Sequence, residues 1–148
     1  MKGYLNQPEK TSEVIQNGWY LTGDIGQMDE DGFITITDRL SRFSKIAGEM
    51  VPHIKIEEAI HRVLNYSEQV AVVTSIADDK KGEKIVVFYT KDFDIPVLID
   101  RLKNSGLPNL WIPSKDLFAK MDSFPFLGSG KLDLGAIKRR AQEVFIHP

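Results

Sequence analysis

The sequence predicts an α+β fold, with a central antiparallel or mixed sheet and helices packed on it. Two strand-like runs, 70–76 and 84–90, flank the polar segment 78–83, which has the composition of a hairpin connection. Segments with the apolar period of a helix precede and follow this pair. We expect the helices on one face of the sheet, because this order favours an α+β layer over a doubly wound parallel sheet.

The N-terminal thirty or so residues predict loops that join short strands. Pro8, Asn17-Gly18 and Asp31-Gly32 interrupt any long periodicity. After the Asp-Gly pair, residues 33–37 alternate and are rich in β-branched side chains, so they predict a strand.

Three helices and a further strand follow from the apolar spacing. A helix that begins at Pro52 has one apolar stripe, formed by Ile56, Ala59, Ile60, Val63 and Leu64. A second helix runs from Pro96 to Gly106, with Val97, Leu98 and Leu102 on the side that covers the hairpin. Alternation of Leu117, Ala119 and Met121 predicts a strand, and Asp133 is the expected N-cap of a closing helix with Leu134, Ile137, Ala141 and Val144.

The composition excludes several classes of function. The 148 residues include no cysteine, so disulfides, zinc fingers, thiolate nucleophiles and thiol redox centres are ruled out. A net charge of -2 argues against general nucleic-acid binding, and we interpret Lys138-Arg139-Arg140 as a solvated helix face. No signal peptide or membrane span is evident, so we expect this segment to be soluble.

Lys131 follows a glycine-rich turn, Gly128-Ser129-Gly130. A nucleotide P-loop is excluded, because Pro125 and Leu132 stand where that motif needs a glycine and a serine or threonine. Spacing alone therefore leaves a solvated turn lysine as the simpler interpretation.

Asp24 and Arg39 are the other polar candidates. The Asp24 carboxylate can accept both hydroxyls of a ribose, and Arg39 can donate to the same ribose or to a phosphate. An ordinary loop aspartate and an exposed salt bridge explain these two residues equally well. His53, His61 and His147 lack the spacing of metal ligands, so we predict no metal site and assign them no role.

The order of these motifs resembles the last third of the adenylate-forming enzymes, the superfamily of acyl-CoA synthetases, luciferases and peptide-synthetase adenylation domains. The motifs are 20–24 (YLTGD), 38–39 (DR), 45–50 (KIAGEM), Glu57 in a helix, and 125–131 (PFLGSGK). Segments 45–51 and 127–131 are most similar to the acyl-acyl-carrier-protein synthetase part of bifunctional 2-acylglycerophosphoethanolamine acyltransferases. The resemblance covers the chain from about Gly18 onward.

The resemblance implies ATP-dependent activation of a fatty acid as an acyl adenylate, followed by transfer to the phosphopantetheine thiol of acyl carrier protein. Lys131 would be the catalytic lysine that bridges the carboxylate and the α-phosphate. Asp24 and Arg39 would position the ribose. Ser41 would be the hinge, and Ala47, Gly48 and Glu49 would line the pantetheine tunnel.

The resemblance also implies a division at residue 38. Residues 1–38 would be the tail of the large domain, and 39–148 the mobile C-terminal domain. The phosphate loop and most of the acyl pocket are not in this sequence, so we expect Mg²⁺ to be bound mainly by the large domain and the segment alone to be inactive. For the full protein, the resemblance implies lysophospholipid as a further substrate and a location on the cytoplasmic side of the inner membrane.

Three positions depart from the family pattern. Met50 replaces a common basic residue, Asp38 a common glycine, and Ser41 a common charged residue. Two alternatives remain open: a coenzyme A ligase domain, and a free-standing module that binds acyl carrier protein without chemistry, through cations such as Arg42, Lys45 and Lys55.

Overall fold

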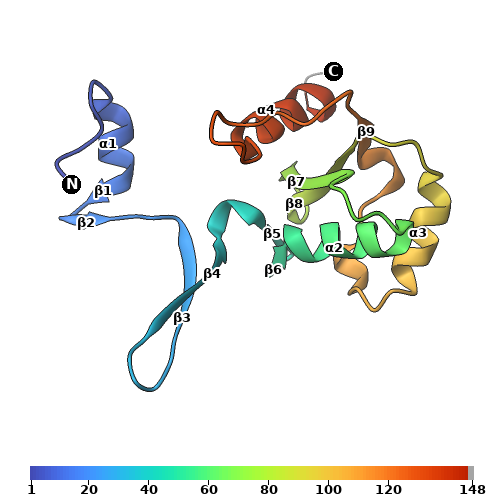
Figure 1. Ribbon diagram of the computed structural model, residues 1–148, viewed down its shortest axis with the longest axis horizontal. Coiled ribbons are helices and arrows are strands. Elements are labelled where there is room, and N and C mark those ends of the chain that lie inside the picture. The colour runs from blue at the N-terminus through green and yellow to red at the C-terminus, as the bar shows by residue number, and fades with distance from the viewer. Residues whose placement is uncertain (147–148) are drawn as a thin grey trace. The chain divides into compact units, whose positions relative to one another are not determined.

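The chain forms two compact units in a computed structural model, which describes residues 1–146 (Figure 1). The first unit spans Met1–Leu40, and the second begins at Ser41. The units divide two residues beyond the boundary that we expect after Asp38, because the strand β4 (Ile34–Arg39) continues past that residue. His147 lies outside the described residues.

The first unit holds one short helix and two antiparallel ribbons. Its elements are α1 (Pro8–Val14), β1 (Ile15–Gln16), β2 (Trp19–Tyr20), β3 (Asp24–Met28) and β4. The strand predicted at 33–37 is confirmed as part of β4. Helix α1 was not predicted, since it is 7 residues long, buries no side chain and so has no apolar stripe in the sequence.

The second unit contains the predicted helices and strands together with a hairpin that was not predicted. Its elements are β5 (Phe43–Ile46), β6 (Glu49–Pro52), α2 (His53–Leu64), β7 (Ala71–Asp78), β8 (Gly82–Tyr89), α3 (Ile95–Lys103), β9 (Phe118–Lys120) and α4 (Leu134–Phe145). Short 3-10 turns cover Leu40–Arg42, Asn109–Trp111 and Lys115–Leu117. The Asp133 side chain accepts a hydrogen bond from the Ala136 N–H at 2.9 Å, which confirms the predicted N-cap of α4.

The sheet of the second unit is mixed. β7 and β8 pair antiparallel from Ala71↔Tyr89 to Asp78↔Gly82, as predicted, while β9 runs parallel to β8. β5 joins the start of β8 through the pair Ile46↔Gly82. This arrangement is the α+β architecture expected from the sequence.

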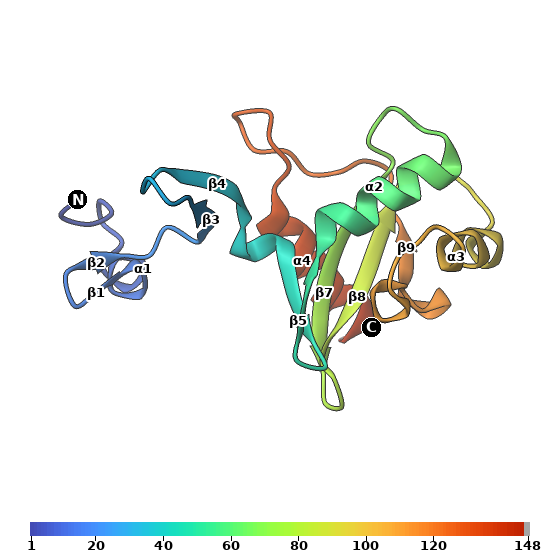
Figure 2. The same cartoon turned by 90° about the horizontal axis from the view of Figure 1, so that it is seen from below.

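Helices cover both faces of this sheet, so the expectation that they lie on one face is wrong (Figure 2). One cluster joins Val73 and Val87 to α2 and α3, and includes the predicted Leu98 and Leu102. The other joins Val72 and Phe88 to α4. The physical reason is that every side chain from 71 to 76 in β7 is buried, so both faces of this strand are apolar and each needs a cover.

None of the helices in residues 1–146 has the length and apolar character that a membrane span requires.

Candidate functional site

Lys131 lies on an exposed loop directly before α4. An isolated antiparallel bridge between Phe126 and Leu132 closes the base of the loop. The Leu127 N–H donates to the Lys131 carbonyl at 2.7 Å, and Gly130, with φ of 78°, donates to the Leu127 carbonyl at 2.8 Å. The left-handed conformation of Gly130 explains why the loop uses glycine there. Within residues 1–146 the Lys131 ammonium forms no ion pair, so it is available to a ligand.

Asp24 and Arg39 lie directly opposite each other in the β3–β4 ribbon. The Arg39 Nε is 3.0 Å from Asp24 Oδ1, and the Leu40 N–H donates to the Gly23 carbonyl beside this pair at 2.8 Å. The Arg39 side chain is 65% exposed, so this surface ion pair contributes little to stability. The ribbon therefore brings together the two residues expected at one ribose.

The Ala47-Gly48 pair forms a tight turn that joins β5 to β6. Ile46 pairs with Glu49, and both turn residues have positive φ, 49° for Ala47 and 88° for Gly48. Two left-handed residues define the turn type whose twist matches a β-hairpin. Alanine in this conformation is strained. No atom lies within 4 Å of a Cβ built at Gly48, so one side of the turn is open.

Three contacts hold this turn in place. The Ala47 N–H donates to the Lys81 carbonyl at 2.8 Å, and the Lys45 N–H donates to Glu83 Oε2 at 2.7 Å. The Trp111 Nε1 donates to Glu49 Oε1 at 2.7 Å, across 62 positions of the chain. The expected tunnel residues are thus fixed to the turn between β7 and β8 and to the 3-10 turn Asn109–Trp111.

Glu83 is the centre of a charged cluster beside this hairpin. Its Oε1 accepts from the Ser75 hydroxyl at 2.7 Å and lies 3.4 Å from Lys138 Nζ. Burial acts to raise the pKa of Glu83, but the Ser75 hydroxyl, the Lys45 N–H and Lys138 together lower it below the usual value. Lys138 also donates to Ser75 at 2.9 Å, so this residue of the predicted solvated face is only 43% exposed, whereas Arg139 and Arg140 are exposed as predicted.

Ser41 is the first residue of the second unit and borders a cavity of about 340 Å³. The other lining residues come from β5, β7 and the first turns of α4: Phe43, Val73, Thr74, Ser75, Leu134, Gly135 and Lys138. The expected hinge residue is therefore exposed and loosely packed on this side.

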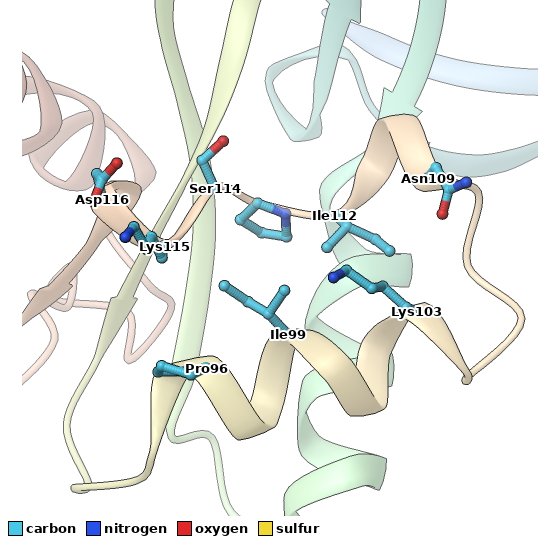
Figure 3. A pocket seen from close by; sticks show the side chains of 9 residues that line it. Pro96, Ile99, Lys103, Asn109, Ile112, Ser114, Lys115 and Asp116 are labelled. Carbon is cyan, nitrogen blue, oxygen red and sulfur yellow. The ribbon is translucent and has the colours of Figure 1, made fainter.

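A broad groove of about 850 Å³ runs between α3 and the segment 109–116 (Figure 3). Ile99 of α3 and Ile112 of the facing segment contribute apolar side chains to it. The Lys103 side chain extends toward Ile112, and Lys115 lies beside Asp116 (Figure 3). An apolar groove with cations at its rim suits a flat ring that carries anionic groups.

Sequence reasoning missed both Trp111 and the groove. The contact of Trp111 with Glu49 joins distant segments and leaves no local pattern in the sequence. It also assigned no role to His53, which is buried at the first position of α2 with its Nε2 2.6 Å from the Ser44 Oγ. Burial, together with Arg42 and Lys138, lowers the pKa of His53 from 6.5 to about 4. Within residues 1–146 no three side chains of His, Asp or Glu gather as metal ligands.

The chain is similar in sequence to known ligases, although no protein-family model matches it. A 2-succinylbenzoate–CoA ligase from Bacillus pumilus is 40% identical over 141 residues, which cover 95% of this chain and 28% of the ligase. A long-chain-fatty-acid–CoA ligase from Mycobacterium tuberculosis is 35% identical over 135 residues, covering 89% of this chain and 26% of the ligase. The chain thus spans less than a third of the length of these relatives.

The fold is shared with solved structures of the same kind. The o-succinylbenzoate CoA synthetase of Bacillus subtilis, in complex with its acyl-adenylate intermediate, matches with a TM-score of 0.65 and 29% identity, over 93% of this chain and 28% of that one. ATP-bound MatB from Rhodopseudomonas palustris matches in fold, with a TM-score of 0.70 and 20% identity over 97% of this chain and 29% of that one. The sequence similarity and the shared fold together place the chain in the superfamily of adenylate-forming acyl- and aryl-CoA ligases, as a C-terminal part of such an enzyme.

Proposed function

We propose that this chain serves both half-reactions of an ATP-dependent acid–thiol ligase. In the first, a substrate carboxylate oxygen attacks the α-phosphorus of ATP, and pyrophosphate leaves. In the second, a thiol sulfur attacks the acyl carbon of the adenylate, and AMP leaves with the pair of electrons from the broken C–O bond. The observation that carries the proposal is Lys131, an ammonium without an ion-pair partner within residues 1–146, on a glycine-supported loop of a ligase-like domain.

Lys131 would act in adenylate formation. A compact ammonium beside the reacting oxygens stabilises the negative charge that grows on them in the transition state. Asp24 and Arg39 would position the ribose. Arg39 contacts Asp24 Oδ1, which leaves Oδ2 of that carboxylate for a ribose hydroxyl. Mg²⁺ that accompanies ATP would be held mainly by residues outside this chain.

The turn Ala47-Gly48 and Glu49 would act in thioester formation. Gly48 offers a backbone without a side chain, with open space on that side, so a pantetheine arm can pass close to it. Rotation of the second unit about Ser41 would exchange Lys131 for this turn in the reaction centre.

The first unit has an exposed apolar face, which supports its assignment to a larger domain of the enzyme. Met28, Ile34 and Ile36 share one face of the β3–β4 ribbon, with exposed fractions of 72%, 73% and 66%. A two-stranded ribbon with an open apolar face is marginally stable by itself. This face fits against the rest of a large domain, of which residues 1–38 would be the tail.

The groove beside α3 favours coenzyme A as the acyl acceptor. The apolar side chains that line the groove suit a purine ring, and Lys103 and Lys115 suit phosphates. Trp111, which holds Glu49, lies in the chain between Asn109 and Ile112 of this groove, so the segment that lines the groove also contacts the residue after the turn. The substrate would be a fatty or aromatic carboxylic acid, as the names of the relatives indicate for those proteins.

Acyl carrier protein is the second candidate acceptor, and its support is the resemblance of segments 45–51 and 127–131 to the acyl-acyl-carrier-protein synthetases. With that acceptor, the enzyme would join fatty acid to carrier protein and pass the acyl group to lysophospholipid at the inner membrane.

The half-reactions test the assignment in the complete enzyme. Lys131→Ala should abolish adenylate formation, measured by pyrophosphate release, yet transfer acyl from preformed adenylate at the wild-type rate. Gly48→Leu should do the reverse, because its side chain obstructs the thiol arm. Gly106→Leu is the matched control, because Gly106 also has a positive φ, 87°, with no atom within 4 Å of a built Cβ, and it should leave both rates unchanged. Equal loss in both half-reactions for either variant would refute the two-conformation assignment.

Acceptor identity is tested by charge reversal in the groove. Lys103→Glu with Lys115→Glu should raise the KM for coenzyme A at least tenfold, whereas Lys80→Glu, on the exposed β7–β8 turn, should leave it unchanged. If the double charge reversal leaves the KM for coenzyme A unchanged and the enzyme acylates carrier protein, acyl carrier protein is the supported acceptor. Salt-sensitive binding of carrier protein to the isolated chain, with Lys131 dispensable, would instead support a non-catalytic module.

A further inference from the structure

The first residue after the expected hinge is fixed by a buried ion pair. Arg42 follows Ser41 in the 3-10 turn, and its Nη2 lies 2.6 Å from Glu57 Oε2 of α2. The two side chains are only 16% and 8% exposed. Buried pairs of this kind are sensitive to the loss of either partner, because the remaining charge is left without compensation.

The same carboxylate also holds β7. Glu57 Oε1 accepts a hydrogen bond from the Val73 N–H at 2.8 Å, on the edge of β7 that faces away from β8. One side chain of α2 therefore connects the start of the second unit to its central sheet. Burial raises the pKa of Glu57, and the Val73 N–H and Arg42 oppose that rise.

Packing of the segment 41–43 is incomplete on one side. Ser41 and Phe43 border the cavity of about 340 Å³, which Val73 of β7 also lines. In addition, the Arg42 Nε is buried without a hydrogen-bond partner within residues 1–146, which is a cost that an apolar side chain would avoid. The contact with Glu57 is therefore the interaction through which Arg42 fixes this segment.

We propose that Arg42 and Glu57 are positioning residues that clamp the start of the second unit, so that rotation at Ser41 moves Lys131 and the turn Ala47-Gly48 as one rigid body. The role of the clamp in catalysis rests on the proposed function. Its effect on the mobility of the segment after Ser41 can be measured in the chain alone.

Without the clamp, Ser41 and Arg42 would lose this link to α2 and β7, while the pairing of β5 with β6 and the contact of Ser44 with His53 would still hold the unit from Phe43 onward. A rotation would then be absorbed at residues 41 and 42.

The decisive variant is the double substitution Arg42→Met with Glu57→Gln. It removes both charges together, and the glutamine oxygen still accepts from the Val73 N–H, so no charge is left buried alone and the chain should fold. Lys55→Met is the matched control, because Lys55 and Glu58 form an exposed ion pair on the same helix at 3.1 Å.

Hydrogen exchange in the chain tests the mechanical part. In the double variant, exchange of the amides of residues 41 and 42 should rise at least tenfold, while β8 and α4 exchange as in the wild type. The control should match the wild type throughout. Unchanged exchange at 41 and 42 in a folded double variant would overturn the clamp, as would an equal rise throughout the unit.

Kinetics in the complete enzyme test the purpose. The double variant should lose at least tenfold in kcat, with KM values for ATP and the acid within twofold of the wild type, because the ligand contacts remain. A kcat within twofold of the wild type would overturn the positioning role. If the wild-type enzyme performs neither half-reaction, the proposed function fails, and the exchange measurement still decides the clamp.

Discussion

Protonation of His53 should make the folded protein lose stability in mild acid. His53 is buried beside Ser44, at the positive end of helix α2, and Arg42 and Lys138 act on it from neighbouring elements. These features lower its pKa from 6.5 to about 4 in the folded chain. The unfolded chain therefore binds a proton near pH 6.5, whereas the folded chain resists protonation until about pH 4.

The sign and size follow from linkage. The unfolded state binds more protons in this pH range, so the stabilising contribution is present above pH 6.5 and is lost as the pH falls toward 4. The loss amounts to about 2 kcal/mol between pH 7 and pH 5, and to about 3 kcal/mol by pH 4. Glu57 acts in the opposite direction, because its raised pKa favours the folded state as the pH falls.

A comparison of variants isolates the histidine. His53→Gln retains a side-chain amide that can bond to Ser44 but has no titrating group. Urea unfolding of both proteins at pH 7, 6 and 5 gives two free-energy curves in which Glu57 contributes equally. The wild type should lose about 2 kcal/mol more than the variant between pH 7 and pH 5. Parallel curves, within about 0.5 kcal/mol or a quarter of that loss, would refute the reasoning.

Five further substitutions test the turn, the cap and the core by the free energy of unfolding in urea. Ala47→Asn should stabilise the chain by about 1 kcal/mol, because asparagine tolerates positive φ better than alanine; destabilisation would contradict the strain at this turn. Asp133→Ala should cost about 1 kcal/mol and Asp133→Ser little, and an equal cost would argue against the cap. Leu102→Ala should cost about 3 kcal/mol, whereas Val97→Ala, exposed on the same helix, should cost under about 0.5 kcal/mol; similar values would contradict the packing of α3.

Elements with a strong local pattern could be predicted from the sequence. The apolar stripe through Ile56 and Ile60 is the buried side of α2, and Asp133 caps α4. Such signals are carried by neighbouring residues and survive any tertiary arrangement. The unbroken apolar run 71–73 also indicates a strand that is buried on both faces, and so a sheet covered on both sides. The sequence analysis did not interpret the run in this way.

The remainder depended on contacts between distant segments. The β5–β6 hairpin was missed, because Ala47 at a left-handed position gives no turn signal and only Gly48 does. The contact between Asp24 and Arg39 depends on the register of a ribbon that is irregular between Ile25 and Gly26. Trp111 meets Glu49 across 62 positions, and no periodicity in either segment reports that contact.

The outer edge of β7 has a consequence for how copies of this chain can associate. Among the described strands β7 pairs only with β8, so its other edge would be a template for an incoming strand. Side chains of α2 already occupy that edge: His61 Nε2 accepts from the Val70 and Ala71 N–H groups, at 3.0 and 3.3 Å, and Glu57 accepts from Val73. An invading strand would have to displace these acceptors, and with them the helix, before it could form its first hydrogen bonds. The helix that covers the core therefore also protects the sheet against edge-to-edge aggregation along this stretch.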